Sequence, residues 1–151
     1  MILIATDGSA AAREAEAIGL ELAAARGDKA AFVCVWAPLR GSFGVPVPEM
    51  LDSEFVEAER TWADETLAQA SARAAAAGMD AEAIVAKGPA VDAICETADR
   101  LGANMVVIGS HGWGAMMSLI FGSTTLGVLQ HAGCPVVVVR DRPDEAAEAG
   151  A

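Results

Sequence analysis

The sequence predicts an α/β fold, in which a mostly parallel sheet carries helices on both faces. Short runs of β-branched and other apolar residues alternate with longer segments whose apolar residues recur every three or four positions. This alternation gives the order β-α-β-α-β-α-β-α-β, which favours parallel strands joined by helices. The length of 151 residues suits a single domain, and no internal repeat is visible.

The chain opens with a predicted strand and a predicted helix. Residues 2–6 form an apolar run, and Ser9 is placed to cap the helix that follows. Small or apolar residues recur along this helix at steps of four and three, which predicts one stripe against the sheet. The stripe consists of Ala11, Ala15, Ile18, Leu22 and Ala25. Gly27 ends the helix, and residues 31–36 form the second strand.

The middle of the chain predicts a loop, a long helix and a third strand. Residues 38–48 contain several glycines and prolines and form the loop, and the helix covers about residues 49–77. Its apolar stripe is Leu51, Phe55, Ala58 and Trp62, then Ala63, Leu67, Ala70 and Ala74. In the third strand, residues 80–86, Asp80 and Glu82 alternate with apolar residues, which indicates a face or an edge that meets water.

The last third of the chain predicts two more helices and two more strands. Pro89 stands in the first turn of a helix whose buried face is Val91, Ile94, Ala98 and Leu101. Residues 105–108 form the fourth strand, residues 109–122 a loop, and residues 123–132 the last helix. The fifth strand is Val136–Val139, and residues 140–151 are a charged, alanine-rich tail that we expect to fray.

The fifth strand contains four valines and no polar position. At an edge of the sheet, the bare backbone of such a strand would invite pairing with another strand. We therefore expect a homodimer that pairs Val136–Val139 with its copy.

Charge and composition exclude several classes of protein. The formal net charge of −11 speaks against binding to nucleic acid and to anionic membranes, because both need a basic surface. No apolar run reaches the roughly 18–20 residues that cross a bilayer, and the first residues lack the basic start of a signal peptide. We therefore expect a cytoplasmic protein without membrane insertion. Cys34, Cys95 and Cys134 have no metal-ligand spacing and are expected to be reduced core residues.

The stretch that carries chemistry follows the fourth strand. It reads Gly109-Ser-His-Gly112, then nine residues, then Gly122-Ser123-Thr124 at the start of a helix. Ligands bind outside the carboxyl ends of parallel strands, and amides freed by glycine beside a helix start can hold phosphate oxygens. Ser123 can add a hydroxyl donor or serve as the helix N-cap. A flexible strand–helix connection is the alternative interpretation, and the stretch matches neither the P-loop nor the dinucleotide fingerprint.

Three motifs of this sequence resemble those of the universal stress protein family. They are the spacing G-x2-G-x9-G-[ST], the opening Ile-Ala-Thr-Asp7-Gly-Ser, and the closing Cys134-Pro135 followed by four valines. The resemblance covers nearly the whole chain and points to the ATP-binding branch. It implies a Rossmann-like, five-stranded sheet in the order 3-2-1-4-5, with a crevice between strands one and four. It also implies a nucleotide-binding domain over residues 1–142 and leaves 143–151 as a flexible acidic tail.

The resemblance implies a role for each matching residue. Asp7 would contact the adenosine, although an aspartate there can also cap a helix. The backbone at about Trp36 would read the adenine edge, and Gly109 would lie by the ribose. The phosphates would be held by Gly112, Gly122, Ser123 and Thr124, with Mg²⁺ or Mn²⁺ shared among phosphate oxygens rather than bound by the protein.

One departure from the family pattern concerns charge. No lysine or arginine occurs from residue 101 to residue 139, although family members often carry one between the glycines. Backbone dipoles, a metal ion or Arg40 would have to neutralise a triphosphate. His111 and His131 lack partners at metal spacing.

The pattern contains no activated nucleophile, so no catalytic residue is assigned. The sequence therefore favours a regulatory ATP-binding module of the stress response. A slow ATPase, an adenylate-transferring enzyme and a dimeric stress protein with an empty cleft are the alternatives.

Overall fold

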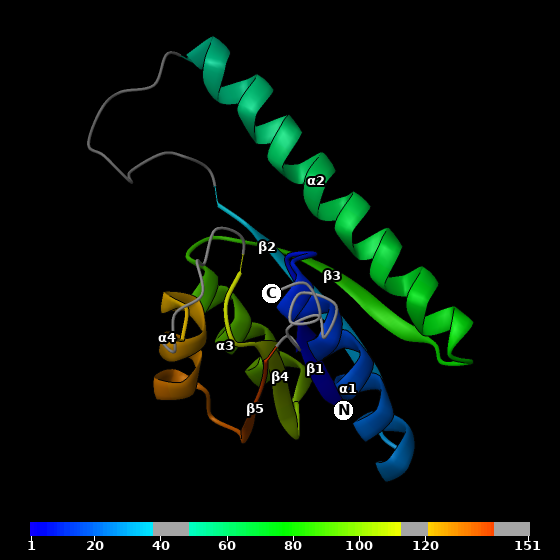
Figure 1. The fold of residues 1–151 in the computed structure, drawn as a ribbon. Helices are drawn as coiled ribbons and strands as arrows, with labels where there is room; N and C mark the ends of the chain where they lie inside the picture. Colours follow the sequence, from blue (N-terminus) through cyan, green and yellow to red (C-terminus); the bar gives the residue numbers. More distant parts are fainter. Residues whose placement is uncertain (38–48, 113–120, 141–151) are drawn as a thin grey trace, which may run out of the picture.

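The computed structural model describes residues 1–37, 49–112 and 121–140. Five strands form one sheet: β1 (Ile2–Ala5), β2 (Ala30–Trp36), β3 (Ala81–Lys87), β4 (Met105–Gly109) and β5 (Val136–Val139). The order is β3-β2-β1-β4-β5, and every neighbouring pair is parallel. The predicted fold class and strand order are confirmed (Figure 1). Strand ends differ from the expected ones by one residue.

Four helices cover the two faces of the sheet: α1 (Ala10–Arg26), α2 (Glu49–Ala76), α3 (Ala90–Leu101) and α4 (Ser123–His131). On one face, α1 and α2 pack against Ile4, Phe32 and Val107. On the other face, Ile94 of α3 and Val128 of α4 pack against Leu3, Val33 and Val106. Each face thus has its own apolar core, and the sheet lies between two helical layers (Figure 1).

The apolar stripe of α1 is rotated from the predicted one. Ser9 caps the helix as expected, since its side chain accepts a hydrogen bond from the amide of Ala12. The buried residues, however, are Ala11, Ala12, Ala15, Glu16, Gly19, Leu20 and Ala23. Leu22 is half-buried and packs against the core as predicted, whereas Ile18 is half-buried outside that core and Ala25 is exposed, so the prediction was wrong at residues 18 and 25. The cause is a buried carboxylate at Glu16 and close packing of Gly19 on Ile4.

The long helix α2 follows the second half of its predicted stripe. Its residues Ala63, Leu67, Ala70 and Ala74 are buried. Ala58 is exposed, whereas Trp62 is half-buried and packs against the core on this face of the sheet. The side chains of Leu51 and Phe55 lie outside the described residues.

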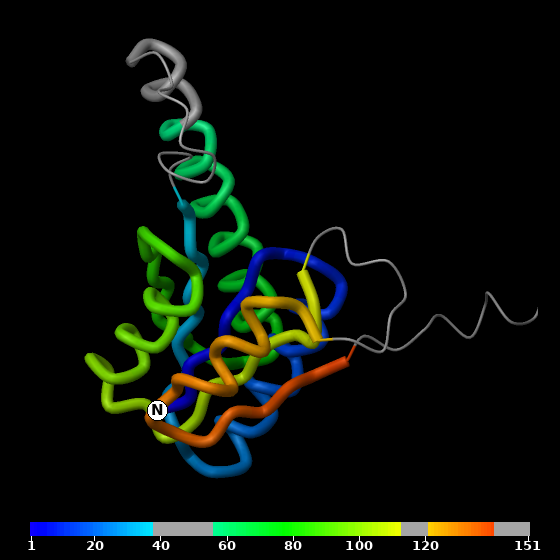
Figure 2. Tube along the Cα trace, turned by 90° about the vertical axis from the view of Figure 1, so that its left-hand side faces the viewer, coloured from blue at the N-terminus to red at the C-terminus, as the bar shows by residue number. Residues whose placement is uncertain are grey.

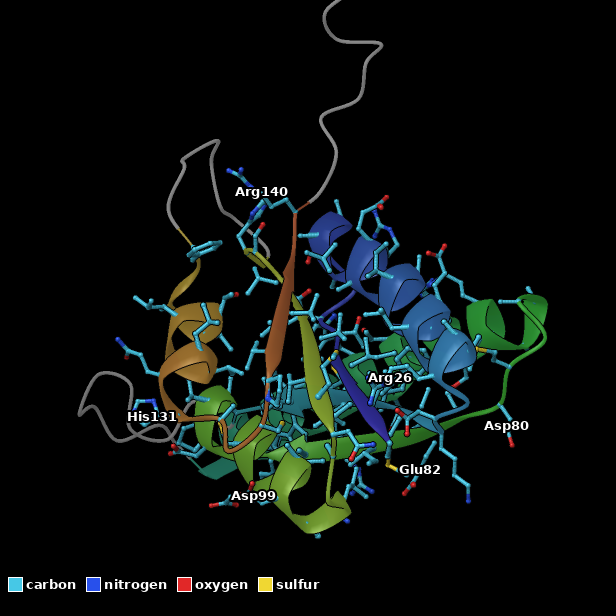
Figure 3. All side chains as sticks on the ribbon, turned by 90° about the horizontal axis from the view of Figure 1, so that it is seen from below. Arg26, Asp80, Glu82, Asp99, His131 and Arg140 are labelled. Carbon is cyan, nitrogen blue, oxygen red and sulfur yellow. The ribbon has the colours of Figure 1, made fainter. Side chains whose placement is uncertain are left out.

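The two edges of the sheet agree with the sequence interpretation. β3 is one edge, and Glu82 on this strand is exposed (Figure 3). β5 is the other edge, and its four valines are half-buried. The expected tail, residues 143–151, lies outside the described residues. In the described ranges, none of the helices has the length and apolar character that a bilayer span requires.

Candidate functional site

The candidate site is a cavity of about 510 Å³ at the carboxyl ends of the strands. The chain leaves β1 toward α1 on one face of the sheet and leaves β4 toward α4 on the other. Strand order therefore reverses between β1 and β4, and a crevice opens there. Figure 2 shows the turn after β1, in blue, beside the end of β4, in yellow. The crevice predicted from the sequence is present.

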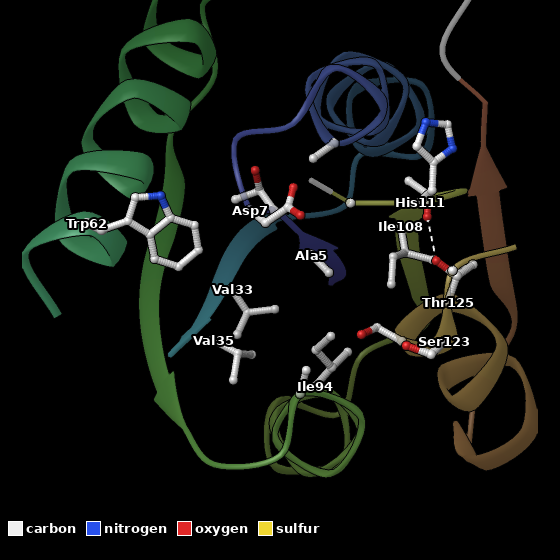
Figure 4. A pocket seen from close by; sticks show the side chains of 17 residues that line it. Ala5, Asp7, Val33, Val35, Trp62, Ile94, Ile108, His111, Ser123 and Thr125 are labelled. Carbon is white, nitrogen blue, oxygen red and sulfur yellow. Dashed lines mark hydrogen bonds between the residues drawn. The ribbon is translucent and has the colours of Figure 1, made fainter. Parts of the chain in front are cut away.

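The turn after β1 brings Asp7 to the cavity. Its Oδ1 accepts a hydrogen bond of 3.0 Å from the amide of Ser9. Gly8 has a φ of +75°, a left-handed conformation that glycine adopts without strain. Since Ser9 holds the cap position of α1, Asp7 is not the cap, and its carboxylate points into the site (Figure 4).

Three glycines of the predicted motif stand at close approaches of the backbone. A Cβ atom on Gly109 would lie 2.8 Å from the carbonyl carbon of Ala11 and 2.9 Å from the amide nitrogen of Ala12. A Cβ on Gly122 would lie 3.3 Å from Cα of His111, and one on Gly112 would meet Oδ2 of Asp7. Packing against backbone atoms requires glycine at 109, whereas a side chain at 112 would displace the Asp7 carboxylate and one at 122 would press on His111.

Hydrogen bonds join the two ends of the loop that carries the glycines. The amide of Gly122 donates to the carbonyl of Ser110 at 2.8 Å. The buried hydroxyl of Thr125 donates to the carbonyl of Gly109, also at 2.8 Å (Figure 4). These bonds hold the end of β4 against the start of α4, and so fix the mouth of the cavity.

The start of α4 faces the cavity with Ser123 and Thr124. The N-cap position belongs to Gly122, so Ser123 is the first helical residue and not the cap. Within the described part of the chain, no side chain caps this helix. The first amides of a helix have no acceptor inside it and carry partial positive charge. This end of the cavity therefore suits an anion.

The opposite end of the cavity is apolar. Figure 4 shows Val33 and Val35 of β2, Ile94 of α3 and Trp62 of α2 around it. Sequence reasoning placed Trp62 in a helical stripe and missed it as a site residue. Its indole supplies an aromatic wall, and flat aromatic ligands stack on such walls.

Trp36 does not belong to the cavity lining. Its side chain packs in the core on the α1 and α2 face, and Lys87 Nζ lies 5.1 Å from the centroid of its ring. Its carbonyl accepts a hydrogen bond from the amide of Gly88. Neighbouring residues of a strand point to opposite faces, so Val35 lines the cavity instead.

The described cavity lining lacks positively charged side chains, as expected from the lack of lysine and arginine between residues 101 and 139. The described lining includes Asp7 and His111 but no lysine or arginine. Ser110 Oγ and His111 Nδ1 lie 2.9 Å apart. Arg13 lies close by, but its Nη1 donates to the carbonyl of Gly8 at 2.6 Å. Arg40 lies outside the described residues.

The geometry agrees with the comparison to known protein families. The family model described as the universal stress protein family matches residues 1–140. The chain belongs to the universal stress protein family.

Relatives with this family name match the chain at similar identity. A universal stress protein from Thermus aquaticus is 32% identical over 140 residues, covering 92% of this chain and 97% of that protein. One from Mycobacterium tuberculosis strain H37Rv is 32% identical over 146 residues, which are 97% of this chain and 50% of that protein. The chain therefore spans about half the length of the Mycobacterium relative.

Solved structures of the family share the fold. UspA from Lactobacillus plantarum has a TM-score of 0.81 at 24% identity, with 92% of this chain and 96% of that chain covered. A universal stress protein crystallised in complex with cAMP has a TM-score of 0.70 at 27% identity, with 93% and 97% covered.

Proposed function

We propose that this universal stress protein binds an adenine nucleotide in the cavity between β1 and β4, with ATP as the expected ligand. The observation that carries the proposal is the convergence of Asp7 and of Gly112, Gly122, Ser123 and Thr124 on one cavity. Two motifs more than a hundred residues apart in sequence meet where parallel sheets bind ligands. We infer that the bound state acts as a regulatory module of the stress response in the cytoplasm.

The two ends of the cavity suit the two ends of a nucleotide. The amides at Gly112 and at the start of α4, with the hydroxyls of Ser123 and Thr124, are donors for phosphate oxygens. Asp7 and Gly109 also line the cavity, and the ribose would stand beside them. The apolar end, with Trp62, Val33 and Val35, suits the base, and the backbone near Trp36 would read its edge. The family member in complex with cAMP supports an adenine ligand.

A phosphate group at this site would have to approach the backbone amides closely. A phosphate can be cradled by amides only where no side chain stands in front of them. Gly112 and Gly122 have no side chain to stand in front of their amides, and the Cβ position of each faces a neighbour, Oδ2 of Asp7 for Gly112 and Cα of His111 for Gly122. The residues present therefore fit a phosphate group.

A divalent cation completes the proposal. Since the described lining holds no lysine or arginine, Mg²⁺ or Mn²⁺ shared among phosphate oxygens would neutralise the triphosphate. Asp7 is the nearby carboxylate, and it would lie at the ribose rather than at the metal.

Slow ATP hydrolysis is the second candidate function. His111 is one of the residues around the cavity, and an imidazole can accept a proton from water. Sustained turnover above about 1 per second would be ordinary for an enzyme. We expect a rate well below that value.

We also propose that two copies pair through β5. This strand is an edge, and the neighbouring α4 exposes Leu126 and Leu129 at 47% and 41%. A second copy would satisfy the open backbone of Val136–Val139 and cover these leucines. Analytical ultracentrifugation at tens of micromolar protein tests the proposed dimer, since even a weak dimer forms at this concentration. A monomer at that concentration would contradict the proposal.

Mass spectrometry of the purified protein tests the main proposal. Protein denatured without added nucleotide should release ATP or another adenine nucleotide in an amount that follows the protein concentration. An adenylate-free supernatant, together with no binding of added nucleotide, would favour the empty-cleft alternative.

A further inference from the structure

A buried carboxylate lies behind the site and not in it. Glu16 of α1 is 1% exposed and does not line the cavity. Its Oε2 accepts a hydrogen bond of 2.6 Å from Nε of Arg73 on α2. Its Oε1 accepts one of 2.5 Å from the hydroxyl of Thr6, at the end of β1. One side chain thus connects two helices to the strand that leads into the site.

The direction of each hydrogen bond in this network is determined. A carboxylate paired with a guanidinium only accepts hydrogen bonds, so the Thr6 hydroxyl must point its proton at Glu16. The hydroxyl oxygen is then left to accept, and the amide of Gly8 donates to it at 3.2 Å. The network therefore runs from Arg73 through Glu16 and Thr6 to the backbone of Gly8.

The network ends on both sides of Asp7. Thr6 precedes Asp7 and Gly8 follows it, so the hydroxyl of the residue before the aspartate holds the amide of the residue after it. The bond selects one conformation for Gly8, because a glycine can adopt a φ of +75° and several other conformations with similar ease. Asp7 in turn faces Gly112 across the cavity. Fixing Thr6 and Gly8 fixes where the Asp7 carboxylate stands.

The same helix that supplies Arg73 also supplies the aromatic wall. Arg73 follows Trp62 by eleven residues, which is close to three turns of an α-helix. The two side chains therefore leave α2 on the same face. The ion pair of Arg73 with Glu16 anchors α2 with Trp62 turned to the cavity.

We propose that Glu16 and Arg73 are positioning residues of the nucleotide site. They act through Thr6 on the Asp7 turn and through α2 on Trp62, without touching the ligand. The proposal rests on the proposed function for its effect on binding, but its effect on the turn does not depend on a ligand. The competing explanation is a buried ion pair that contributes to stability alone.

The experiment compares Glu16→Gln and Arg73→Met with a control, Arg26→Met. Arg26 pairs with Asp28 at 2.9 Å in the last turn of α1, whereas the cavity is lined by Ala12 near the start of this helix. Two quantities are measured: the Kd for ATP and for adenosine, and amide hydrogen exchange at Gly8 by NMR. Adenosine is included because the network acts on the Asp7 and Trp62 half of the site.

We expect Glu16→Gln and Arg73→Met to raise both Kd values by about fivefold to tenfold, which corresponds to the net contribution of one ordinary hydrogen bond. Exchange at Gly8 should accelerate by a similar factor, Arg73→Lys should restore part of the binding, and Arg26→Met should match the wild type. Unchanged Kd values and unchanged Gly8 exchange in folded variants would overturn the proposal.

Two further outcomes are distinguishable. If the Glu16 and Arg73 variants do not fold, Thr6→Val leaves the ion pair in place and removes only the link to Gly8. It should still accelerate Gly8 exchange, and exchange as slow as in the wild type would overturn the proposal. If the wild type binds neither ligand, the proposed function fails, while Gly8 exchange still decides the role of the network.

Discussion

Gly112 faces the carboxylate of Asp7 so closely that a Cβ atom at position 112 would meet Oδ2 of the aspartate. The two residues come from the ends of β4 and β1, which are neighbours in the sheet. This contact joins the adenosine side of the proposed site to its phosphate side. Glycine at 112 permits this close contact, and its φ does not lie in the left-handed region that would by itself favour glycine.

Replacing Gly112 with alanine should weaken nucleotide binding more than it affects folding. The added methyl group displaces the Asp7 carboxylate, and overpacking of this kind costs roughly 1–3 kcal/mol. We expect the Kd for ATP to rise by about tenfold in calorimetry. A double-mutant cycle with Asp7→Ala is the control. If Gly112→Ala weakens binding equally in both backgrounds, the contact with Asp7 is not the cause.

Removing the indole of Trp62 should weaken binding of the base. Stacking on an aromatic side chain contributes about 1–3 kcal/mol per base. Trp62→Ala should therefore raise the Kd for both ATP and adenosine, by about fivefold or more, whereas Trp62→Phe keeps most of the affinity. Equal affinity of the alanine variant and the wild type would place the base elsewhere.

Chelation of divalent metal should lower the affinity for ATP severalfold. The described lining carries no lysine or arginine, so the phosphates depend on the cation for neutralisation. Adenosine has no phosphate and serves as the matched ligand, whose affinity should not change. Titrations with and without chelator measure both, and identical ATP constants would show that the backbone amides suffice.

The buried thiol of Cys34 predicts a loss of stability at high pH. Burial raises the pKa of Cys34 to about 12, and the negative charge of Asp7 adds to this effect. Above about pH 9 the thiol ionises in the unfolded state but stays protonated in the folded state. The free energy of unfolding therefore decreases as the pH rises. The loss approaches about 1.4 kcal/mol per pH unit for one proton.

Urea unfolding of the wild type and of Cys34→Ala at pH 8 and about pH 10 measures this loss. The difference between the two proteins should shrink by about 1 kcal/mol at the higher pH. Other groups titrate in both proteins and cancel. If the difference in free energy of unfolding between the two proteins does not depend on pH, the pKa of Cys34 is not raised by folding.

The sequence alone predicts the fold because most of its signals are local. Val136–Val139 is an unbroken β-branched run, and Ser9 precedes a helix that it does cap. The phase of α1 was missed because Glu16 is held by Arg73, 57 positions away. An analysis of helical periodicity assigns a glutamate such as Glu16 to the solvent face, because it contains no information on a partner as distant in sequence as Arg73.

The same contrast separates the site residues. Asp7, Gly109, Gly112, Gly122, Ser123 and Thr124 all line one cavity, and strand order was enough to bring them together. Trp62 was counted with the core stripe of α2, since periodicity cannot tell a core wall from a cavity wall. The alternation along β2 around Trp36 would have pointed to Val35, whose side chain faces the other side of the strand.

Titration of nucleotide-free protein with ATP and Mg²⁺ by calorimetry, on the wild type and on Gly122→Val, shows whether backbone amides next to glycine hold the phosphates. We predict one saturable site per chain, and an affinity at least about tenfold weaker in Gly122→Val, whose side chain would crowd His111. If the wild type does not bind ATP up to millimolar concentration, which corresponds to a binding free energy of roughly −4 kcal/mol, the proposed nucleotide site is wrong. Equal affinities of the variant and the wild type would show that the amides beside Gly122 do not hold the phosphates.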